Sequence, residues 1–268
     1  MGILNVTEDS FFDGGRYRTD AAVLKRAEQI LSEGGAIIDI GAVSTRPGAA
    51  DVSAEEEWAR LQPALQQILR EFPDAVISID TWRAEVARRS VEYGAAVIND
   101  ISGGTFDAAM AGVVAAAHVP YVMMHTTAKP AQMQLQTVSG DLWEAVFQFF
   151  DRQLDLFRAA GANDIILDPG FGFGKTLEQN YQLMNELEKF QKYHLPILVG
   201  ISRKSMIYKL LKTNPDGALN GTTVLNTIAL MKGADILRVH DVKEAVEAVK
   251  IVKQLKTENG KRKIVEPS

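Results

Sequence analysis

The sequence contains no cysteine, and this absence removes several classes of chemistry. Disulfides, thiolate nucleophiles and cysteine-ligated zinc are all excluded. A cysteine-free chain fits the reducing cytoplasm, where we expect the protein to be located. No apolar stretch reaches the length of about 18 residues that a membrane-spanning helix needs, so we expect no membrane partner.

The chain also has no excess of positive charge. It carries 29 Lys and Arg against 34 Asp and Glu, a formal net charge of −5. This balance argues against a nucleic-acid-binding surface. An anionic substrate must therefore be bound by local basic residues or helix N-termini. A hydrophobic content of 46% with 24% charged residues is typical of a globular protein.

Eight short apolar runs recur along the chain, and most of them are rich in Val and Ile. Most lack the alternation of a half-exposed strand, which is typical of strands buried on both faces of a parallel sheet. The runs are GILNV (2–6), AIIDIG (36–41), AVISID (75–80), AAVIND (95–100), VPYVMMH (119–125), DIILDPG (164–170), PILVGIS (196–202) and ADILRVH (234–240).

Segments with helical spacing lie between these runs, for example 20–35, 53–72 and 141–161. Ser53 and Glu56 form the pattern of a capping box at the start of the second segment. Pro63 lies inside that segment and predicts a kink or two short helices. Gly161 at the end of the third segment is a helix-stop signal.

Strand alternating with helix predicts an α/β fold with right-handed crossovers and a parallel sheet. Eight such units match a closed (β/α)₈ TIM barrel, a fold that typically takes about 250 residues. A doubly wound open sheet is the alternative. We expect a single barrel domain over residues 1–256, followed by a polar C-terminal tail over 257–268.

Polar residues stand at or just past the end of successive apolar runs. In a barrel all these ends open onto one face, where active sites are built. For Asp39 taken alone, the cap of the following helix is the favoured interpretation. That interpretation does not explain the whole set, because converging buried polar groups are costly without a polar ligand. The set comprises Asn5, Asp39, Asp80, Asn99, His125, Asp168, Lys204, Arg238 and His240.

The residue types in this set indicate a class of ligand. Asp80, Asn99 and Asp168 suit a flat heterocycle with a donor-rich edge, which carboxylates bind through paired hydrogen bonds. Basic side chains suit phosphate or carboxylate groups, which Arg binds in a bidentate way. The basic residues concerned are Arg46, Arg203, Lys204, Arg238 and His240.

The stretch GFGFGKT (170–176) ends like a phosphate-binding P-loop, but its spacing fails. The first Gly of that motif would fall at position 169, which is Pro169. We interpret the stretch as a tight strand-to-helix loop whose glycines let a flat ligand approach the backbone. His125 is a candidate metal ligand or base, but with no second His nearby a structural role is favoured.

Taken in order, the motifs GILNVTEDSFFDGG, STRPGA, SIDT, INDI, LDPGFGFGK, GISRKS and RVHDV resemble those of the dihydropteroate synthase family. The resemblance covers nearly the whole chain. It implies a (β/α)₈ barrel and a transferase that joins (7,8-dihydropterin-6-yl)methyl diphosphate to p-aminobenzoate. The products are 7,8-dihydropteroate and pyrophosphate. It also implies Mg²⁺ as cofactor and a homodimer.

The resemblance also implies roles for individual residues. Asp80, Lys204, Arg238 and His240 match the catalytic positions. The pterin-holding positions are Asp80, Asn99, Asp168 and Lys204, with Ile101, Met124 and Phe173 packing on the ring. The diphosphate positions are Asn5, Thr45, Arg238 and His240, and Asn5 also matches the Mg²⁺ contact. The p-aminobenzoate positions are Phe11, Asp13, Arg46, Pro47 and Ser205.

Several loop positions depart from the family's usual pattern. Glu8 and Phe12 replace Pro and Ser, and Ala42-Val43 replace Gly-Glu. The stretch after His125 lacks the usual Met and Gly. The altered first loop is similar to that of sulfonamide-insensitive members of the family. We therefore hypothesise altered discrimination between sulfonamides and p-aminobenzoate.

Three other interpretations compete with the synthase. One is the methyltetrahydrofolate-binding domain of corrinoid-dependent methyltransferases, which shares the Asp/Asn/Asp set but binds no diphosphate. Another is a non-catalytic pterin-binding paralogue with altered loops. The third is a phosphate-binding barrel such as an aldolase, which requires a Schiff-base Lys. Arg238, His240 and the run Ser202–Ser205 favour the synthase over the methyltransferase domain. The presence of Asn5, Asp13, Arg46 and Lys204 argues against the paralogue. Lys204 lies past a strand end beside Arg203, which argues against the aldolase.

Overall fold

The computed structural model describes residues 1–6, 16–43, 52–130, 132 and 136–262, without the side chains of 16–20 and 258–262. Strands and helices alternate along the chain. The strands are β1 (Gly2–Asn5), β2 (Ile37–Gly41), β3 (Val76–Asp80), β4 (Val97–Asp100), β5 (Tyr121–Met124), β6 (Ile165–Asp168), β7 (Leu198–Val199) and β8 (Ile236–Leu237). The helices are α1 (Arg16–Ser32), α2 (Ala54–Glu71), α3 (Ala84–Glu92), α4 (Met110–Ala117), α5 (Leu142–Ala160), α6 (Leu177–Asn185), α7 (Ser205–Leu210), α8 (Leu219–Met231) and α9 (Val242–Arg262). Two 3₁₀ segments, η2 (Leu187–Tyr193) and η3 (Asp216–Ala218), precede β7 and α8.

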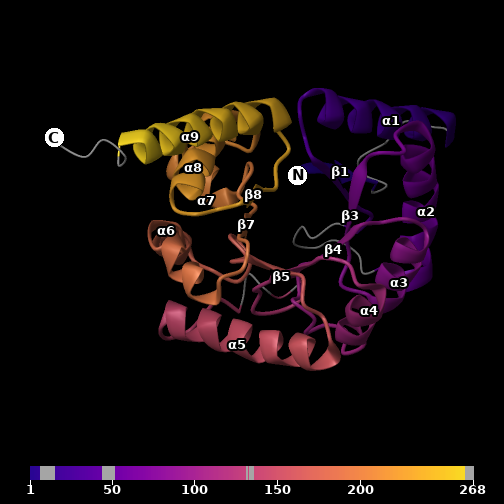
Figure 1. The fold of residues 1–268 in the computed structure, drawn as a ribbon, viewed down its shortest axis with the longest axis horizontal. Helices are drawn as coiled ribbons and strands as arrows, with labels where there is room; N and C mark the ends of the chain where they lie inside the picture. Colours follow the sequence, from indigo (N-terminus) through magenta and orange to yellow (C-terminus); the bar gives the residue numbers. More distant parts are fainter. Residues whose placement is uncertain (7–15, 44–51, 131, 133–135, 263–268) are drawn as a thin grey trace.

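The strands form a closed parallel barrel inside a ring of helices (Figure 1). Strands β1 to β6 pair in sequence order, and β7 pairs with β8. Two bridges close the ring: Leu167 of β6 pairs with Ile197, and Gly2 of β1 pairs with Val239. The barrel is therefore confirmed, and the open sheet is wrong.

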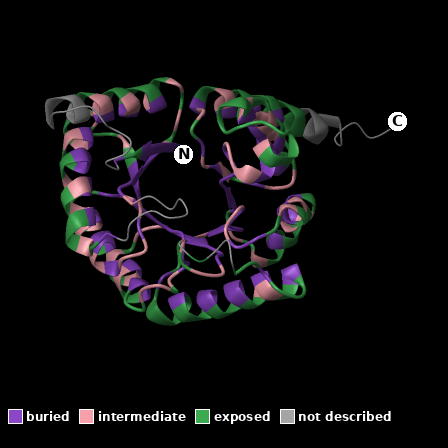
Figure 2. Ribbon diagram, turned by 180° about the vertical axis from the view of Figure 1, so that it is seen from behind, coloured by how far each residue is buried: buried purple, intermediate pink, exposed green. Residues whose placement is uncertain are grey.

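The strands are buried on both faces, as their unbroken Val and Ile content predicts (Figure 2). Toward the helices, their side chains join one large apolar core. Inside the barrel, Val97, Val122 and Leu198 from three different strands form a separate small cluster. This apolar cluster fills part of the barrel interior, and most of the side chains predicted to converge lie at or just past the C-terminal ends of the strands.

Local sequence signals fix several helix ends. At the start of α2 the Ser53 hydroxyl accepts from the Glu56 N–H at 3.2 Å, and the Glu56 carboxylate accepts from the Ser53 N–H at 2.9 Å. The predicted capping box is thus confirmed. Helix α2 continues through Pro63, so the alternative of two short helices is wrong. Helix α5 ends at Gly161, whose φ of 99° suits glycine.

Helix α9 runs to Arg262 and so continues into the stretch that composition assigns to a polar tail. The division of the chain at residue 256 stays a prediction. Within the described part of the chain, no helix is long and apolar enough to cross a membrane.

Candidate active site at the barrel mouth

The polar side chains predicted to converge do come from the C-terminal ends of the barrel strands. Strand pairing places Asp80 of β3 beside Gly41 of β2 and beside Asn99 of β4. Asp168 ends β6, Lys204 immediately precedes α7, and Arg238 follows β8. Residues more than 150 positions apart are thereby brought to one mouth.

Arg238 is the centre of this arrangement. Its Nε donates to Asp39 Oδ2 at 2.6 Å, and its Nη2 donates to Asp80 Oδ2 at 2.6 Å. Only about a fifth of the Arg238 side chain is exposed. Burial alone would lower the pKa of Arg238, but the carboxylates of Asp39 and Asp80 outweigh it and raise that pKa. The guanidinium is thus a fixed positive charge that two carboxylates share.

The prediction of a helix cap at Asp39 is wrong. This residue does not cap a helix; it lies within β2 and is fully buried inside the barrel. Its carboxylate accepts from the Ser78 hydroxyl at 2.6 Å and from the Asn99 amide at 3.2 and 3.3 Å, in addition to Arg238. The sequence contained a signal for this interior position, which is a carboxylate in the middle of the apolar run Ile-Ile-Asp-Ile. An Asp inside a barrel requires hydrogen-bond donors or a cation as partners.

Burial disfavours the ionised form of the carboxylates at the mouth. Burial raises the pKa of Asp80 to about 7, although the charge of Arg238 opposes the shift. Burial also raises the pKa of Asp168, opposed chiefly by Lys204. Asp168 accepts a hydrogen bond from the Gly170 N–H at 2.8 Å. A ligand that brings donors or positive charge would stabilise both groups in their ionised form.

Lys204 lies against the loop that follows β6. Its Nζ donates to the Phe171 carbonyl at 2.5 Å and lies 4.5 Å from the centre of the Phe173 ring. Burial lowers the pKa of Lys204 to about 8, against the opposing effect of Asp168. The amine therefore remains largely charged at neutral pH, beside both an aromatic ring and a carboxylate.

Three apolar side chains expected to pack on a ring lie at neighbouring strand ends. Ile101 and Met124 are buried, at 6% and 3% exposed, and they follow β4 and end β5. Phe173 is half-buried in the loop after β6.

The other described candidates lie around the rim. Asn5 ends β1 and is exposed, whereas Ser205 begins α7 and is half-buried. His240 is exposed, and its backbone N–H donates to the Ser202 hydroxyl at 3.2 Å. Local desolvation, followed by the charge of Arg238, lowers the pKa of His240 and keeps its imidazole neutral. Phe11, Asp13, Thr45, Arg46 and Pro47 lie outside the described residues.

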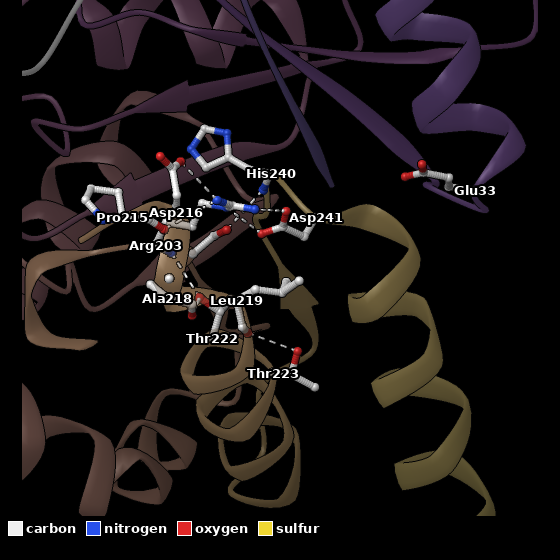
Figure 3. Close-up of polar contacts among 12 residues, drawn as sticks. Glu33, Arg203, Pro215, Asp216, Ala218, Leu219, Thr222, Thr223, His240 and Asp241 are labelled. Carbon is white, nitrogen blue, oxygen red and sulfur yellow. Dashed lines mark hydrogen bonds and ion pairs between the residues drawn. The ribbon is translucent and has the colours of Figure 1, made fainter. Parts of the chain in front are cut away.

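Arg203 was expected to bind an anion, but it already has partners (Figure 3). Its guanidinium forms a bidentate pair with Asp241 at 2.8 and 2.9 Å. Its backbone N–H donates to the Thr222 hydroxyl at 3.1 Å. The pair with Asp241 joins the loop before α7 to the loop after β8, and the bond to Thr222 joins the first of these loops to α8. Arg203 thus supports the neighbouring Lys204 and does not face a ligand.

The fit of a divalent cation can be judged from the donors at the mouth. Among the described residues, no group of three or more acidic or His side chains is placed to hold a metal ion. The carboxylates of Asp39 and Asp80 are engaged by Arg238, whereas Asn5 at the end of β1 is exposed. Mg²⁺ commonly takes one or two protein ligands and completes its shell with water and substrate phosphates. These residues fit an ion that arrives with a diphosphate and rests on Asn5.

Comparison with known proteins agrees with this geometry. The family model described as pterin binding enzyme matches residues 1–240. The dihydropteroate synthase of Escherichia coli strain K12 is 44% identical over 254 residues, which cover 94% of this chain and 89% of that protein.

Two solved structures have the same fold. The dihydropteroate synthase of Clostridium difficile, solved in the presence of pteroic acid, matches with a TM-score of 0.89 and 36% identity, over 95% of each chain. The Yersinia pestis enzyme, solved with a sulfonamide drug, matches with a TM-score of 0.89 and 43% identity, over 96% of this chain and 93% of that one. The chain belongs to the dihydropteroate synthase family of pterin-binding enzymes.

Proposed function

We propose that this chain joins (7,8-dihydropterin-6-yl)methyl diphosphate to p-aminobenzoate, releasing pyrophosphate and forming 7,8-dihydropteroate. Family membership makes the chain a transferase of folate biosynthesis. The observation that carries the assignment of residues is the convergence of Asp80, Asn99, Asp168 and Lys204 around Arg238 at one barrel mouth.

The pterin is the ligand that these four residues suit. Asp80 and Asp168 accept from the donor-rich edge of the ring, and Lys204 donates to its acceptors. Asn99 can do both with its amide. Ile101, Met124 and Phe173 pack on the ring faces. The relative from Clostridium difficile was solved in the presence of pteroic acid, which contains this ring.

The diphosphate is bound by Asn5, Thr45, Arg238 and His240. Arg238 is held by Asp39, so it can turn one edge toward an anion without losing its anchor. Mg²⁺, if carried in by the substrate and supported by Asn5, would neutralise part of the diphosphate charge. Thr45 belongs to this proposal from the motif alone, since it lies outside the described residues.

The p-aminobenzoate is bound by Ser205 at the start of α7 and by the residues of two loops. Those loop residues are Phe11, Asp13, Arg46 and Pro47, all outside the described residues. The relative from Yersinia pestis was solved with a sulfonamide drug. Because the first loop departs from the usual family sequence, we propose that sulfonamide sensitivity is altered in this chain.

The chemistry is a substitution at the pterin methylene carbon. The bond from this carbon to the diphosphate oxygen breaks, and its electron pair leaves with the diphosphate. Positive charge then develops on the pterin. The p-aminobenzoate nitrogen attacks the methylene and loses a proton to solvent, so the protein supplies no nucleophile.

The charges at the mouth suit this pathway. The carboxylates of Asp39, Asp80 and Asp168 lie close to the cations Arg238 and Lys204, and Asp168 also interacts with the charge of Lys175. When ionised, the carboxylates of Asp80 and Asp168 would stabilise positive charge on a pterin. Orientation and preorganised electrostatics are thus the enzyme's main contributions.

A homodimer is the proposed assembly. Helix α8 exposes Val224, Ile228 and Met231, which follow the i, i+4, i+7 spacing of one helix face. Helix α9 beside it exposes Ile251 and Leu255. Adjacent apolar side chains of this kind are typical of a surface covered by a partner.

We also propose a cytoplasmic location, because a chain without cysteine fits a reducing compartment.

The deciding experiment measures pyrophosphate release from the pterin diphosphate and Mg²⁺, with and without p-aminobenzoate. The proposed function requires release that depends on p-aminobenzoate and matches the dihydropteroate formed. Pterin binding without turnover would indicate a non-catalytic paralogue. Binding of methyltetrahydrofolate with no diphosphate requirement would indicate a methyltransferase domain.

A further inference from the structure

The motif GFGFGKT contains a lysine, Lys175, to which the proposed reaction gives no role. Lys175 is only 7% exposed, so it does not face a ligand as the lysine of a phosphate-binding loop does. Its Nζ donates to His125 Nδ1 at 2.8 Å, to the Gly170 carbonyl at 2.9 Å and to the Phe173 carbonyl at 3.1 Å.

These three contacts use all the hydrogen-bond donors of an ammonium group. A buried amine needs such partners, because an unpaired charge in the interior is very costly. Burial lowers the pKa of Lys175 to about 7, while the charge of Asp168 opposes the shift. When Lys175 is protonated it only donates, so His125 Nδ1 accepts from it and the imidazole is neutral. Burial and the charge of Lys175 lower the pKa of His125 in agreement with this state.

The carbonyls that Lys175 binds mark the two ends of one tight turn, Gly170 to Phe173. The turn is closed by a hydrogen bond from the Phe173 N–H to the Gly170 carbonyl at 3.1 Å. Gly170 has a φ of 71°, and a Cβ there would lie 1.9 Å from the His125 carbonyl oxygen. The turn is therefore pressed directly against the end of β5.

The opposite side of the same turn contacts the candidate pterin site. The Phe171 carbonyl accepts from Lys204, and the Phe173 ring lies beside the Lys204 amine. Asn180 binds the middle of the turn by accepting from the Gly172 N–H at 2.7 Å. On the β5 side, His125 directly follows Met124. Lys175 thus connects the two segments that carry Met124 and Phe173.

We propose that Lys175 and His125 form a buried clamp that sets the pterin site. The clamp fixes the turn 170–173, and with it Phe173 and the carbonyl that binds Lys204, relative to Met124. Neither residue touches the substrate; both are positioning residues. The inference rests on the proposed function, because the pterin is the ligand whose binding the clamp controls.

The test replaces Lys175 with Met, which keeps the chain length and removes the ammonium group. We expect the pterin KM of Lys175→Met to rise about ten- to hundredfold, since displacements of about 1 Å can have effects of this size. The KM for p-aminobenzoate should stay within about twofold of wild type, because Ser205, the described residue of that site, begins α7 and is not among the hydrogen-bond partners of the Lys175 amine. Lys189→Met, at an exposed lysine paired with Glu186 on η2, is the matched control and should behave as wild type.

A second pair of variants keeps the proposal testable if Lys175→Met does not fold. His125→Asn places an amide oxygen where Nδ1 accepts, whereas His125→Leu removes the acceptor. The clamp requires a near-normal pterin KM in the first variant and a raised one in the second. An unchanged pterin KM in folded Lys175→Met or His125→Leu, or an equal rise in both substrates' KM, would overturn it. If wild type shows no turnover, the proposed function fails, and calorimetric pterin binding by the same variants still decides the clamp.

Discussion

Arg238 and Asp39 are 199 positions apart in the chain, yet the guanidinium Nε donates to the Asp39 carboxylate at 2.6 Å. The same guanidinium donates to Asp80 at 2.6 Å. One cation therefore joins a carboxylate deep in the barrel to a carboxylate at its mouth. Since Asp39 also binds Asn99, it orients two of the side chains assigned to substrate, Asn99 and Arg238.

The first prediction concerns this buried carboxylate. In Asp39→Asn, Arg238 loses its anchor and pairs more fully with Asp80, which then binds the pterin less well. A charge-assisted hydrogen bond contributes about 1.5–3 kcal/mol. We expect kcat/KM for the pterin substrate to fall about tenfold or more. Ser78→Ala, which removes one neutral partner of Asp39, should have a smaller effect, and an Asp39→Asn enzyme with wild-type kinetics would contradict the role.

The second prediction concerns Asp80 itself. Asp80→Asn removes the carboxylate that is proposed to bind the pterin edge and leaves Arg238 paired with Asp39. Pterin affinity should weaken by about 1.5–3 kcal/mol for each charge-assisted bond lost. Isothermal titration with the pterin substrate measures this directly. An affinity equal to wild type would remove Asp80 from the pterin site.

The third prediction is a narrow pH optimum for kcat/KM of the pterin substrate, which reports on ionisations in the free enzyme. The pKa of Asp80 is raised to about 7, so acidification below this value protonates the carboxylate and lowers the rate. The pKa of Lys204 is lowered to about 8, so a pH above this value removes its charge and lowers the rate again.

Two variants separate the limbs of this profile. Asp80→Asn should lose the acid limb, because the amide does not titrate. Lys204→Arg should retain its charge beyond pH 8 and shift the alkaline limb upward. A profile that keeps both limbs in these variants would assign the ionisations to other groups.

The fold could be predicted because its signals are local. Apolar runs rich in Val and Ile recur eight times, and several of the helices between them carry caps or Gly stops. Each of these signals is set by neighbours in sequence. The mouth could be predicted too, because strand ends of a parallel barrel share one face.

The partners within the mouth could not be predicted. Arg203 and Arg238 both follow apolar runs, and only tertiary distances show that Asp241 engages the first while Asp39 and Asp80 share the second. The helix cap predicted at Asp39 has the same cause. An Asp caps the next helix if the strand ends before it and lies in the interior if the strand continues, and β2 continues to Gly41. The role of Lys175 depends on a contact with His125, 50 positions earlier.

The fourth prediction tests the proposed dimer surface on α8. Met231 is 51% exposed beside Ile228, and a charge there would be buried against the partner. Met231→Asp should weaken dimerisation by at least about 2 kcal/mol, the cost typical of a central interface residue. Sedimentation velocity measures the shift toward monomer. Leu156→Asp, at a side chain 48% exposed on α5, is the control and should leave the association state unchanged.

The fifth prediction compares two Gly-to-Ala substitutions that differ in backbone and surroundings. At Gly170 the φ of 71° disfavours alanine, and the added Cβ would lie 1.9 Å from the His125 carbonyl oxygen, so the turn must move away from β5. At Gly112, within α4, the added Cβ meets nothing within 4 Å, and alanine should stabilise the helix by about 0.5–1 kcal/mol. Thermal unfolding should therefore show a lower Tm for Gly170→Ala and an equal or higher Tm for Gly112→Ala.

The same two variants should also differ in kinetics. Because the turn carries the Phe171 carbonyl that binds Lys204, Gly170→Ala should raise the pterin KM in the fraction that remains folded, whereas Gly112→Ala should not. A Gly170→Ala protein with both Tm and pterin KM unchanged would show that the turn can shift without disturbing either β5 or the site.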